Sequence, residues 1–451
     1  MIRRVLALYA LGWLLAAPLV AAYLLWRSIR QPAYRSHWGE RFGLHPARRD
    51  DAPLIWIHAV SLGETRAAQP LVAALADAHP DARVLLTCMT PTGREAAREL
   101  YAPRLGDRFA QAYLPYDHPL AQRRFLRAWR PSIGLLMETE LWPSLAAECA
   151  RAGVPLALVN ARLSERSLRR GMRQRALVGP AARSLALVLA QSPDDAARIA
   201  RLGRAADAVT GNLKFDNAPR GELLERGRAW RVRIGRPVVL AASTRDGEEA
   251  LLLDAWRRAG PGAAPGAPVR GTSADRRRDP LLVVVPRHPQ RFDEVVRDAR
   301  AAGLRVARRA ALDDASADLD AVDLLVGDSM GEMDAWYALA DVAVIGGSLR
   351  PFGSQNLIEP CAAGCPVLVG PSTFNFAQAA EQAVAAGAAE RVADADAAIG
   401  RALALLADPA AAAAMGEAGR RFATTHRGAT RRTMDALAPL RARLGSRGGP
   451  G

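Results

Sequence analysis

The sequence has few of the residues that mark nucleic-acid-binding proteins. Aromatic residues make up 6% of its 451 residues, and it contains no zinc-finger spacing, RNA-binding aromatic motif or basic repeat. The net charge of +15 comes from arginines that are scattered along the chain, so it does not predict a nucleic-acid partner. A positive surface beside an anionic membrane accounts for this charge better.

Lysine and cysteine are also scarce. Lys214 is the only lysine among 61 basic residues, which indicates a general bias toward arginine. The four cysteines, Cys88, Cys149, Cys361 and Cys365, form no C-x-x-C pair, and no histidine cluster has zinc spacing. We therefore expect buried thiols in a reducing compartment and no bound metal or cofactor. A dinucleotide oxidoreductase is disfavoured, because no G-x-G-x-x-G with a downstream acidic residue follows an early strand.

One long apolar run lies near the N-terminus. Residues 5–26 carry no charge and are numerous enough to cross about 30 Å of hydrocarbon. A cleaved signal peptide is the alternative, but the run is longer than a usual signal core and lacks a small-residue cleavage site. Arginines flank both ends and are more numerous on the C-terminal side. Residues 1–30 are therefore predicted to be a single-pass inner-membrane anchor with the body of the protein in the cytoplasm.

The rest of the chain alternates between short apolar runs and amphipathic helical segments. This pattern predicts an α/β fold of two Rossmann-like parallel-sheet domains, at 31–210 and 211–425. A Gly-, Pro- and Arg-rich insertion at 260–280 is predicted to be mobile, and the tail 446–451 disordered. The predicted strands are 54–60, 83–88, 133–137, 156–160, 185–190, one starting at 238, 281–285, 304–307, 324–326, 342–345 and 366–369.

Motifs along nearly the whole chain resemble those of the 3-deoxy-D-manno-octulosonic acid (Kdo) transferases. In chain order they are WIHAVSLGET (56–65), TPTGREAA (90–97), YLPYDHP (113–119), METELWP (137–143), NARLSERS (160–167), GNLKFD (211–216), VPRHPQRF (285–292), GDSMGEM (327–333), GGS (346–348), GSQNLIEP (353–360) and STFNF (372–376).

The resemblance implies an inverting, metal-independent enzyme of the glycosyltransferase B fold, whose two domains face each other across a cleft. Its donor would be CMP-Kdo, a co-substrate, and its acceptor the lipid A precursor of lipopolysaccharide. It also implies that a last helix, at 426–445, packs back on the first domain. The alternatives are another nucleotide-sugar transferase of this fold and, outside enzymes, a basic lipid-binding protein.

Carboxylates follow two predicted strands of the first domain. Glu64 lies in Ser61–Thr65, which is predicted to open a helix through Arg66–Ala76. A carboxylate there could serve as the general base for an attacking sugar hydroxyl. The alternative is a glutamate that stabilises its own helix start. Ser61 and Arg66 are candidates for acceptor binding. Glu138 and Glu140 would point in opposite directions if their strand continued, so we expect one of them, preferably Glu138, to act in catalysis.

The second half offers groups for a nucleotide at three strand ends, where free N–H groups collect. Arg287 and His288 follow one strand, Ser329, Met330, Gly331 and Glu332 follow another, and Asn356 and Glu359 follow a third. Ser329–Gly331 are predicted to open a helix, and 356–363 to form a helix that Gly364 ends in a left-handed conformation. Glu359 is expected to accept the ribose hydroxyls, and the first groups to hold phosphate or base. The alternatives are a structural His288 and a Glu359 that only stabilises its helix terminus.

Two features of the Kdo transferase resemblance concern single residues. Lys214 is expected to contact the donor, the alternative being a solvated loop residue. The family often has His in the G-G-H-N turn, where this chain has Gln355, which cannot take a charge. The sequence does not determine the number of Kdo units transferred, the acceptor's phosphorylation or the oligomeric state.

Overall fold

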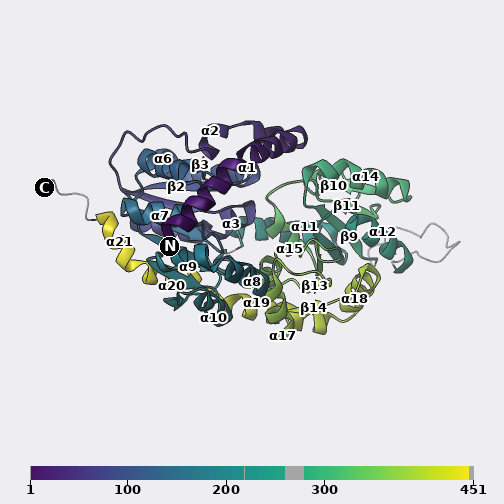
Figure 1. The fold of residues 1–451 in the computed structure, drawn as a ribbon. Helices are drawn as coiled ribbons and strands as arrows, with labels where there is room; N and C mark the ends of the chain where they lie inside the picture. Colours follow the sequence, from purple (N-terminus) through teal and green to yellow (C-terminus); the bar gives the residue numbers. More distant parts are fainter. Residues whose placement is uncertain (1, 218, 260–278, 446–451) are drawn as a thin grey trace. The chain divides into compact units, whose positions relative to one another are not determined.

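The computed structural model describes residues 2–217, 219–259 and 279–445, which form two compact units. Unit 1 comprises Met1–Asn217 and Arg427–Gly451, and unit 2 comprises Ala218–His426. The predicted insertion at 260–280 lies almost entirely outside the described residues, and the tail 446–451 lies wholly outside them. Each unit contains a seven-stranded parallel sheet, which confirms the predicted fold class (Figure 1).

The sheet of unit 1 has the order β3-β2-β1-β4-β5-β6-β7, and all of its pairs are parallel. Strands β1, β2 and β3 are therefore added in chain order toward one edge of the sheet, and β4 begins the series that is added toward the other edge, so the order reverses between β1 and β4. In open α/β sheets, ligands bind at such a point, beyond the carboxyl ends of the strands. The strands are β1 Leu54–His58, β2 Arg83–Cys88, β3 Phe109–Tyr113, β4 Ile133–Met137, β5 Leu156–Ala161, β6 Leu187–Ala190 and β7 Ala208–Val209.

Helices cover the unit 1 sheet, and the last two come from the C-terminal end of the chain. Leu437, Leu440 and Leu444 join the core that lies on one face of the sheet. The helices are α1 Ile2–Arg30, η1 Pro32–Arg35, α2 Trp38–Arg41, α3 Leu62–Ala67, α4 Gln69–Ala78, α5 Pro91–Leu105, η2 Gly106–Arg108, α6 Pro119–Trp129, α7 Pro143–Ala152, α8 Glu165–Arg173, α9 Arg175–Arg183, α10 Pro193–Arg201, η3 Leu213–Asp216, α20 Ala429–Ala436 and α21 Ala438–Gly445.

The sheet of unit 2 has the order β10-β11-β9-β8-β12-β13-β14 and changes direction between β8 and β12. Its strands are β8 Val238–Thr244, β9 Leu281–Pro286, β10 Val306–Arg308, β11 Leu324–Val326, β12 Val342–Ile345, β13 Val367–Val369 and β14 Ala389–Arg391. Its helices are α11 Gly221–Ile234, α12 Glu248–Ala259, η4 Pro289–Arg291, α14 Phe292–Ala301, η5 Arg309–Leu312, α15 Met333–Leu339, α16 Ile358–Ala363, α17 Ala377–Ala385, α18 Ala395–Ala407 and α19 Pro409–Thr425.

Burial explains why the central strands could be read from the sequence. Every residue of β1, β4, β9 and β12 is buried, because helices cover both faces of a parallel sheet. The four cysteines are free and buried, as predicted. Gly364 ends α16 with φ +78°, the left-handed cap that the sequence predicted.

The structure corrects several local predictions. Three strands were missed: β3, and the short β7 and β14. The helix predicted to run through Arg66–Ala76 is broken at Ala68 into α3 and α4. In unit 2, Ser329–Gly331 do not open α15, which begins at Met333, and Asn356 precedes α16 rather than lying within it.

The N-terminal apolar run forms the long helix α1. Its segment Arg4–Ile29 has the length and composition of a membrane span, with a mean hydropathy of 2.1 in its most apolar window. The helix packs on unit 1, where Trp13 stacks on Tyr116 with ring centroids 5.6 Å apart. Leu24 and Ser28, near its C-terminal end, are buried.

Candidate functional site

The two carboxylates ranked highest from the sequence lie at the carboxyl ends of adjacent strands in unit 1. Glu64 follows β1, and Glu138 directly follows β4. Because β1 and β4 flank the point where the strand order reverses, both side chains lie where this type of sheet binds its ligands.

The carboxyl group of Glu64 holds its proton more strongly than an ordinary glutamate does. The backbone N–H of Val60 donates to Glu64 Oε2 at 2.8 Å, which fixes the carboxylate over the end of β1. Burial raises the pKa of Glu64 to about 8, and the negative charges of Glu138 and Glu140 add to this effect. The Val60 hydrogen bond and Lys214 act in the opposite direction but do not outweigh it.

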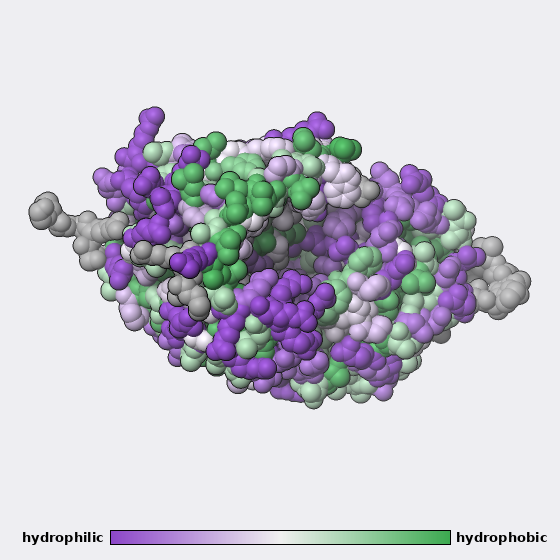
Figure 2. Space-filling view, in the orientation of Figure 1, coloured by the Kyte–Doolittle hydropathy of each residue, from purple (hydrophilic) through white to green (hydrophobic). Residues whose placement is uncertain are grey.

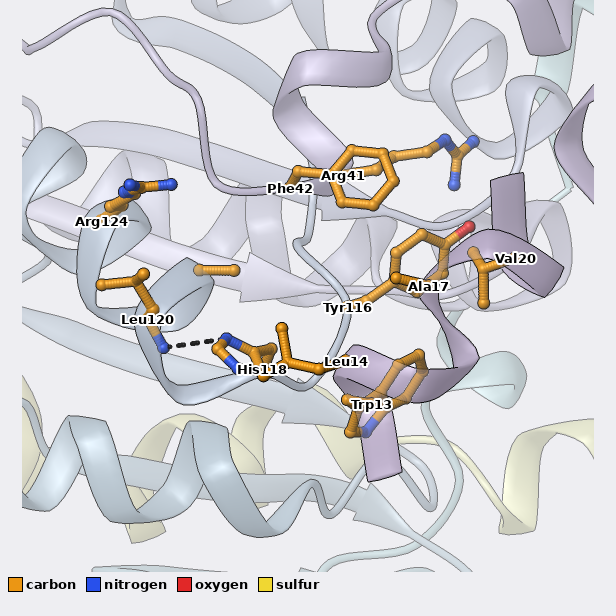
Figure 3. Close-up of a pocket in the computed structure, with 11 residues that line it drawn as sticks. Trp13, Leu14, Ala17, Val20, Arg41, Phe42, Tyr116, His118, Leu120 and Arg124 are labelled. Atoms are coloured by element: carbon orange, nitrogen blue, oxygen red, sulfur yellow. Dashed lines mark hydrogen bonds between the residues drawn. The ribbon is translucent and has the colours of Figure 1, made fainter. Parts of the chain in front are cut away.

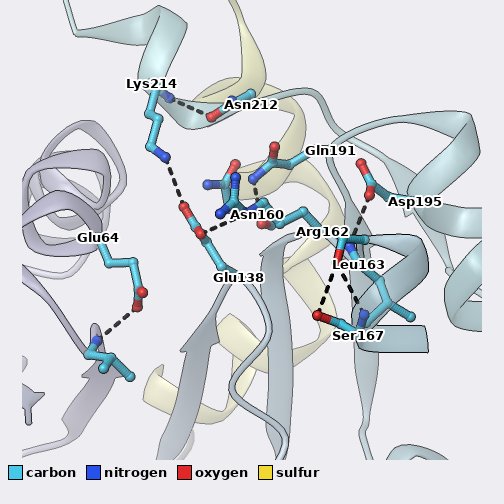
Figure 4. A network of polar contacts seen from close by, with 12 residues as sticks. Glu64, Glu138, Asn160, Arg162, Leu163, Ser167, Gln191, Asp195, Asn212 and Lys214 are labelled. Carbon is cyan, nitrogen blue, oxygen red and sulfur yellow. Dashed lines mark hydrogen bonds and ion pairs between the residues drawn. The ribbon is translucent and has the colours of Figure 1, made fainter. Parts of the chain in front are cut away.

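Glu138 is ionised by two basic neighbours. Its Oε1 lies 3.0 Å from Lys214 Nζ and its Oε2 lies 3.0 Å from Arg162 Nε (Figure 4). Burial alone would raise the pKa of Glu138, but Lys214 and Arg162 outweigh it and hold the pKa below its usual value. Arg162 was not among the predicted site residues, although it lies within the motif NARLSERS.

The backbone at Glu138 differs from the expectation of a continued strand. Glu138 has φ +55°, a left-handed conformation in which the chain turns away from β4. Glu140 then accepts a hydrogen bond from Trp142 Nε1 at 2.7 Å, and burial raises its pKa. The choice between the two carboxylates therefore rests on their partners: Glu138 carries a stabilised charge, whereas Glu140 is held by an indole.

Lys214 is not a solvated loop residue, since its side chain is 14% exposed. The 3-10 turn η3 that carries it is fixed by side chains from unit 1. Asn160 Oδ1 accepts from the N–H of Leu213 at 3.0 Å, and Asn212 Oδ1 accepts from that of Lys214 at 3.0 Å. Asp216 accepts from the N–H groups of Gly428 and Thr430 at the start of α20. The predicted contact between Lys214 and the donor stays a prediction.

The two acceptor-binding candidates lie close to Glu64 in sequence and differ in exposure. Ser61 precedes α3 and its hydroxyl makes no capping hydrogen bond to that helix. Arg66 is exposed on α3. Their role in acceptor binding stays a prediction.

In unit 2, the donor-binding candidates follow strands β9, β11 and β12. Arg287 and His288 come directly after β9. Burial lowers the pKa of His288, and the charges of Arg245, Arg287 and Arg291 lower it further, so this imidazole is neutral at pH 7. A neutral imidazole beside arginines can donate or accept a hydrogen bond at a phosphate without adding charge.

The turn after β11 is held by Glu332. Its carboxylate accepts from Arg309 Nη2 at 2.8 Å, from Arg226 Nη1 at 3.0 Å and from Ser329 Oγ at 2.5 Å. These partners take up much of its capacity to accept hydrogen bonds, so the structure favours a positioning role for Glu332 over ligand contact. Met330, in contrast, is half-exposed at the tip of this turn.

Asn356 and Glu359 face each other at the start of α16. Asn356 Nδ2 donates to Glu359 Oε1 at 3.0 Å, while Asn356 Oδ1 accepts from the N–H of Ile358 at 3.0 Å. Asn356 thus orients the Glu359 carboxylate. Gln355, in place of the family's histidine, donates its backbone N–H to Gly346 O at 2.9 Å.

A fourth strand end in unit 2 was missed from the sequence. Ser243 and Thr244 are the last residues of β8 and Arg245 follows them; Ser243 has φ +56°. Buried Glu248 accepts from the N–H groups of Arg245 at 2.9 Å and of Gly347 at 2.6 Å. It therefore links the ends of β8 and β12, the two strands at the reversal point of this sheet. The available signal in the sequence was the polar pair Ser243-Thr244 at the end of an apolar run, with Glu248 a few residues later.

The described residues contain no group of three or more His, Cys, Asp or Glu side chains that could hold a metal ion. Two Asp-x-Asp sequences occur, at 318–320 and 394–396, and both stabilise local backbone. Asp318 accepts from the N–H of Asp320, and Asp394 caps α18 by accepting from that of Ala397.

Comparison with known proteins identifies relatives of this chain. The family model described as 3-deoxy-D-manno-octulosonic-acid transferase (kdotransferase) matches residues 36–217. Across 93% of this chain and 96% of the relative, the sequence is 48% identical to the 3-deoxy-D-manno-octulosonic acid transferase of Bordetella pertussis. It is 33% identical to the enzyme of the same name from Haemophilus influenzae, with 94% and 96% covered.

A solved structure supports the fold. The Anabaena protein Alr3699/HepE, in complex with UDP, has a TM-score of 0.54 over 86% of this chain and all of that chain, at 14% identity. Identity this low shows the two-unit architecture alone, whereas the two sequence relatives show kinship over nearly the full length. The chain belongs to the 3-deoxy-D-manno-octulosonic acid transferase family and is a glycosyltransferase.

Proposed function

We propose that this enzyme moves Kdo from CMP-Kdo to a hydroxyl of the lipid A precursor with inversion at the anomeric carbon. The acceptor hydroxyl forms a new bond to that carbon as the bond from the carbon to the CMP phosphate breaks. The hydroxyl proton passes to Glu64, and CMP departs with the bonding electrons. A single displacement of this kind inverts the configuration.

One observation carries the proposal: Glu64 lies at the reversal point of the unit 1 sheet, with its pKa raised to about 8. A base is most effective when its pKa lies near the working pH, because it then removes a proton strongly while a sufficient fraction is ionised. Glu138, held ionised by Lys214 and Arg162, supplies part of the negative field that raises this pKa.

In unit 2 the strand-end groups are proposed to hold CMP-Kdo. Arg287, His288 and the turn Ser329–Gly331 would contact the phosphate and the base, with Met330 against the base. Glu359, oriented by Asn356, would accept the two ribose hydroxyls. Since CMP leaves as a monophosphate, its charge can be met by such side chains and N–H groups.

The acceptor and the membrane are proposed to meet unit 1. Arg66 and Ser61 lie beside Glu64 in sequence and would orient the acceptor. The apolar helix α1 would anchor the enzyme at the bacterial inner membrane, with both units in the cytoplasm, where positive charge favours anionic lipid.

The test is an assay of purified protein with CMP-Kdo and the lipid A precursor, set against other nucleotide sugars. Transfer with CMP-Kdo, with product of inverted configuration by NMR, is the expected result. Glu64→Gln keeps the size and the Val60 hydrogen bond but removes the base, so kcat should fall by at least about a hundredfold while CMP binding is retained. Transfer from another donor alone would contradict the proposed substrate, and near-normal kcat in Glu64→Gln would remove Glu64 from the mechanism.

A further inference from the structure

A pocket of about 220 Å³ lies in unit 1 between α1 and the segments around α2 and the start of α6. Figure 3 shows Trp13, Leu14, Ala17 and Val20 of α1 on one side of it, and Phe42, Tyr116 and Leu120 across from them. Most of the lining is apolar.

The two faces of α1 differ in side-chain size. The face that is at least partly covered by unit 1 includes four alanines, Ala10, Ala16, Ala17 and Ala21. The opposite face exposes large aliphatic side chains and is visible as an apolar band on unit 1 in Figure 2. Small residues let a helix approach its neighbour closely, and one of these four, Ala17, lines the pocket. The exposed aliphatic residues of this face are Leu8, Leu11, Leu15, Leu19, Leu25 and Ile29.

The pocket lies at the same edge of the sheet as the proposed base. Tyr116 and His118 follow β3, and Glu64 follows β1, with β2 between these strands. The carboxyl ends of parallel strands share one edge, and neighbouring strands are about 4.8 Å apart. Two strand spacings, roughly 10 Å, therefore separate the end of β3 from that of β1.

Basic side chains accompany the apolar lining. Arg41 is 1% exposed and donates Nη1 to Met89 O at 3.1 Å. Among the described residues, its Nε and Nη2 find no hydrogen-bond acceptor of good geometry. Arg124 is exposed at the pocket. Apolar walls with arginine beside them suit a molecule that has both a hydrocarbon chain and an anionic group.

We propose that this pocket binds one acyl chain of the acceptor lipid while the sugar hydroxyl of the same molecule is at Glu64. The inference rests on the proposed function and extends it to an acyl-chain subsite. A chain in the pocket would be continuous with the exposed leucines of α1, so a lipid could enter from the bilayer without crossing water. Each buried methylene should favour binding by about fourfold.

The experiment compares two acceptors in detergent micelles with CMP-Kdo as donor. One is the lipid A precursor with its native acyl chains, and the other is the same disaccharide with acetyl groups in their place. The readout is the ratio of kcat/KM for the two acceptors. Ala17→Phe fills the pocket from α1, and Leu120→Asp places a carboxylate in its half-exposed wall.

Both variants should lower the ratio at least tenfold, through KM for the long-chain acceptor. Ala22→Phe is the matched control, because it adds the same ring to the exposed face of α1 and should leave the ratio unaltered. A wild-type ratio near one, or a ratio in Ala17→Phe equal to that of the wild type, would overturn the subsite. Absence of transfer to either acceptor by the wild type would instead refute the proposed function.

Discussion

The carboxylate of Glu138 lies 3.0 Å from the ammonium group of Lys214, and the two side chains are 7% and 14% exposed. Glu138 directly follows β4, whereas Lys214 lies in η3, 76 positions later in the chain. The pair therefore ties the η3 turn to the centre of the unit 1 sheet. Since a second partner, Arg162, holds the other oxygen of Glu138, the network also fixes a negative charge beside Glu64.

Lys214→Met should lower the stability of the protein as well as its activity. The substitution leaves a buried carboxylate with one basic partner, and breaking a buried pair costs about 3 kcal/mol. The measurement is the free energy of unfolding in urea. The double variant Glu138→Gln, Lys214→Met should recover most of the loss, because it has a neutral amide in place of the buried carboxylate. An unfolding free energy equal to that of the wild type in Lys214→Met would contradict the ion pair.

The pH dependence of kcat/KM should report the pKa of Glu64. Its raised pKa means that the base is mostly protonated at pH 7, so kcat/KM should rise with pH, reach half its maximum near the pKa of about 8 and level off roughly one pH unit higher. Glu138→Gln removes a negative charge that raises this pKa, so the rise should shift to lower pH. Steady-state rates between pH 5.5 and 9.5 measure both profiles. A Glu138→Gln profile shifted to higher pH would be incompatible with the described field.

The sequence predicted the central strands and their carboxylates for a physical reason. Strands such as β4 and β12 are buried on both faces, so their sequences are uninterrupted apolar runs, and the residues that follow them lie at one edge of the sheet. Once the strand order is known, this placement predicts that Glu64 and Glu138 lie at the ends of adjacent strands. The edge strands β7 and β14, two and three residues long, are too short to give such a signal.

The features that could not be predicted from the sequence depend on contacts between segments that are distant in the chain. Arg162 resembles many other arginines, and its role follows from the pairing of β5 with β4 and from the left-handed turn at Glu138. Glu332 looked like a ligand group but is paired with Arg226 and Arg309, which are distant in the sequence. The strand end at Ser243–Arg245 was overlooked because β8 was predicted only by its start at Val238, with no end assigned to it.

Glu359→Gln should weaken CMP binding and reduce the preference for ribose. If the carboxylate accepts both ribose hydroxyls, the amide can accept less strongly, and the dissociation constant for CMP should rise about tenfold. Calorimetric titration with CMP and 2′-deoxy-CMP measures both effects. The wild type should discriminate between the two nucleotides, and Glu359→Gln should discriminate less. Glu381→Gln, the same change at an exposed position of α17, is the control. Equal loss of affinity for both nucleotides in Glu359→Gln would mean that this carboxylate acts on the fold rather than on the ribose.

Removal of residues 1–22 should separate membrane attachment from folding. The described core clusters of the two units contain no residue of α1, so the truncated chain should remain folded. The cut falls before Leu24 and Ser28, which are buried against unit 1; a longer deletion of 1–30 should cost additional stability by removing them.

The truncated protein should lose binding to anionic phospholipid vesicles in flotation assays, since the exposed leucines of α1 are gone. Its melting temperature should stay within a few degrees of the full-length value, because the loss falls outside both cores. A large drop in melting temperature for the 1–22 deletion would show that α1 contributes to folding, whereas retained vesicle binding would place the membrane contact elsewhere on the protein.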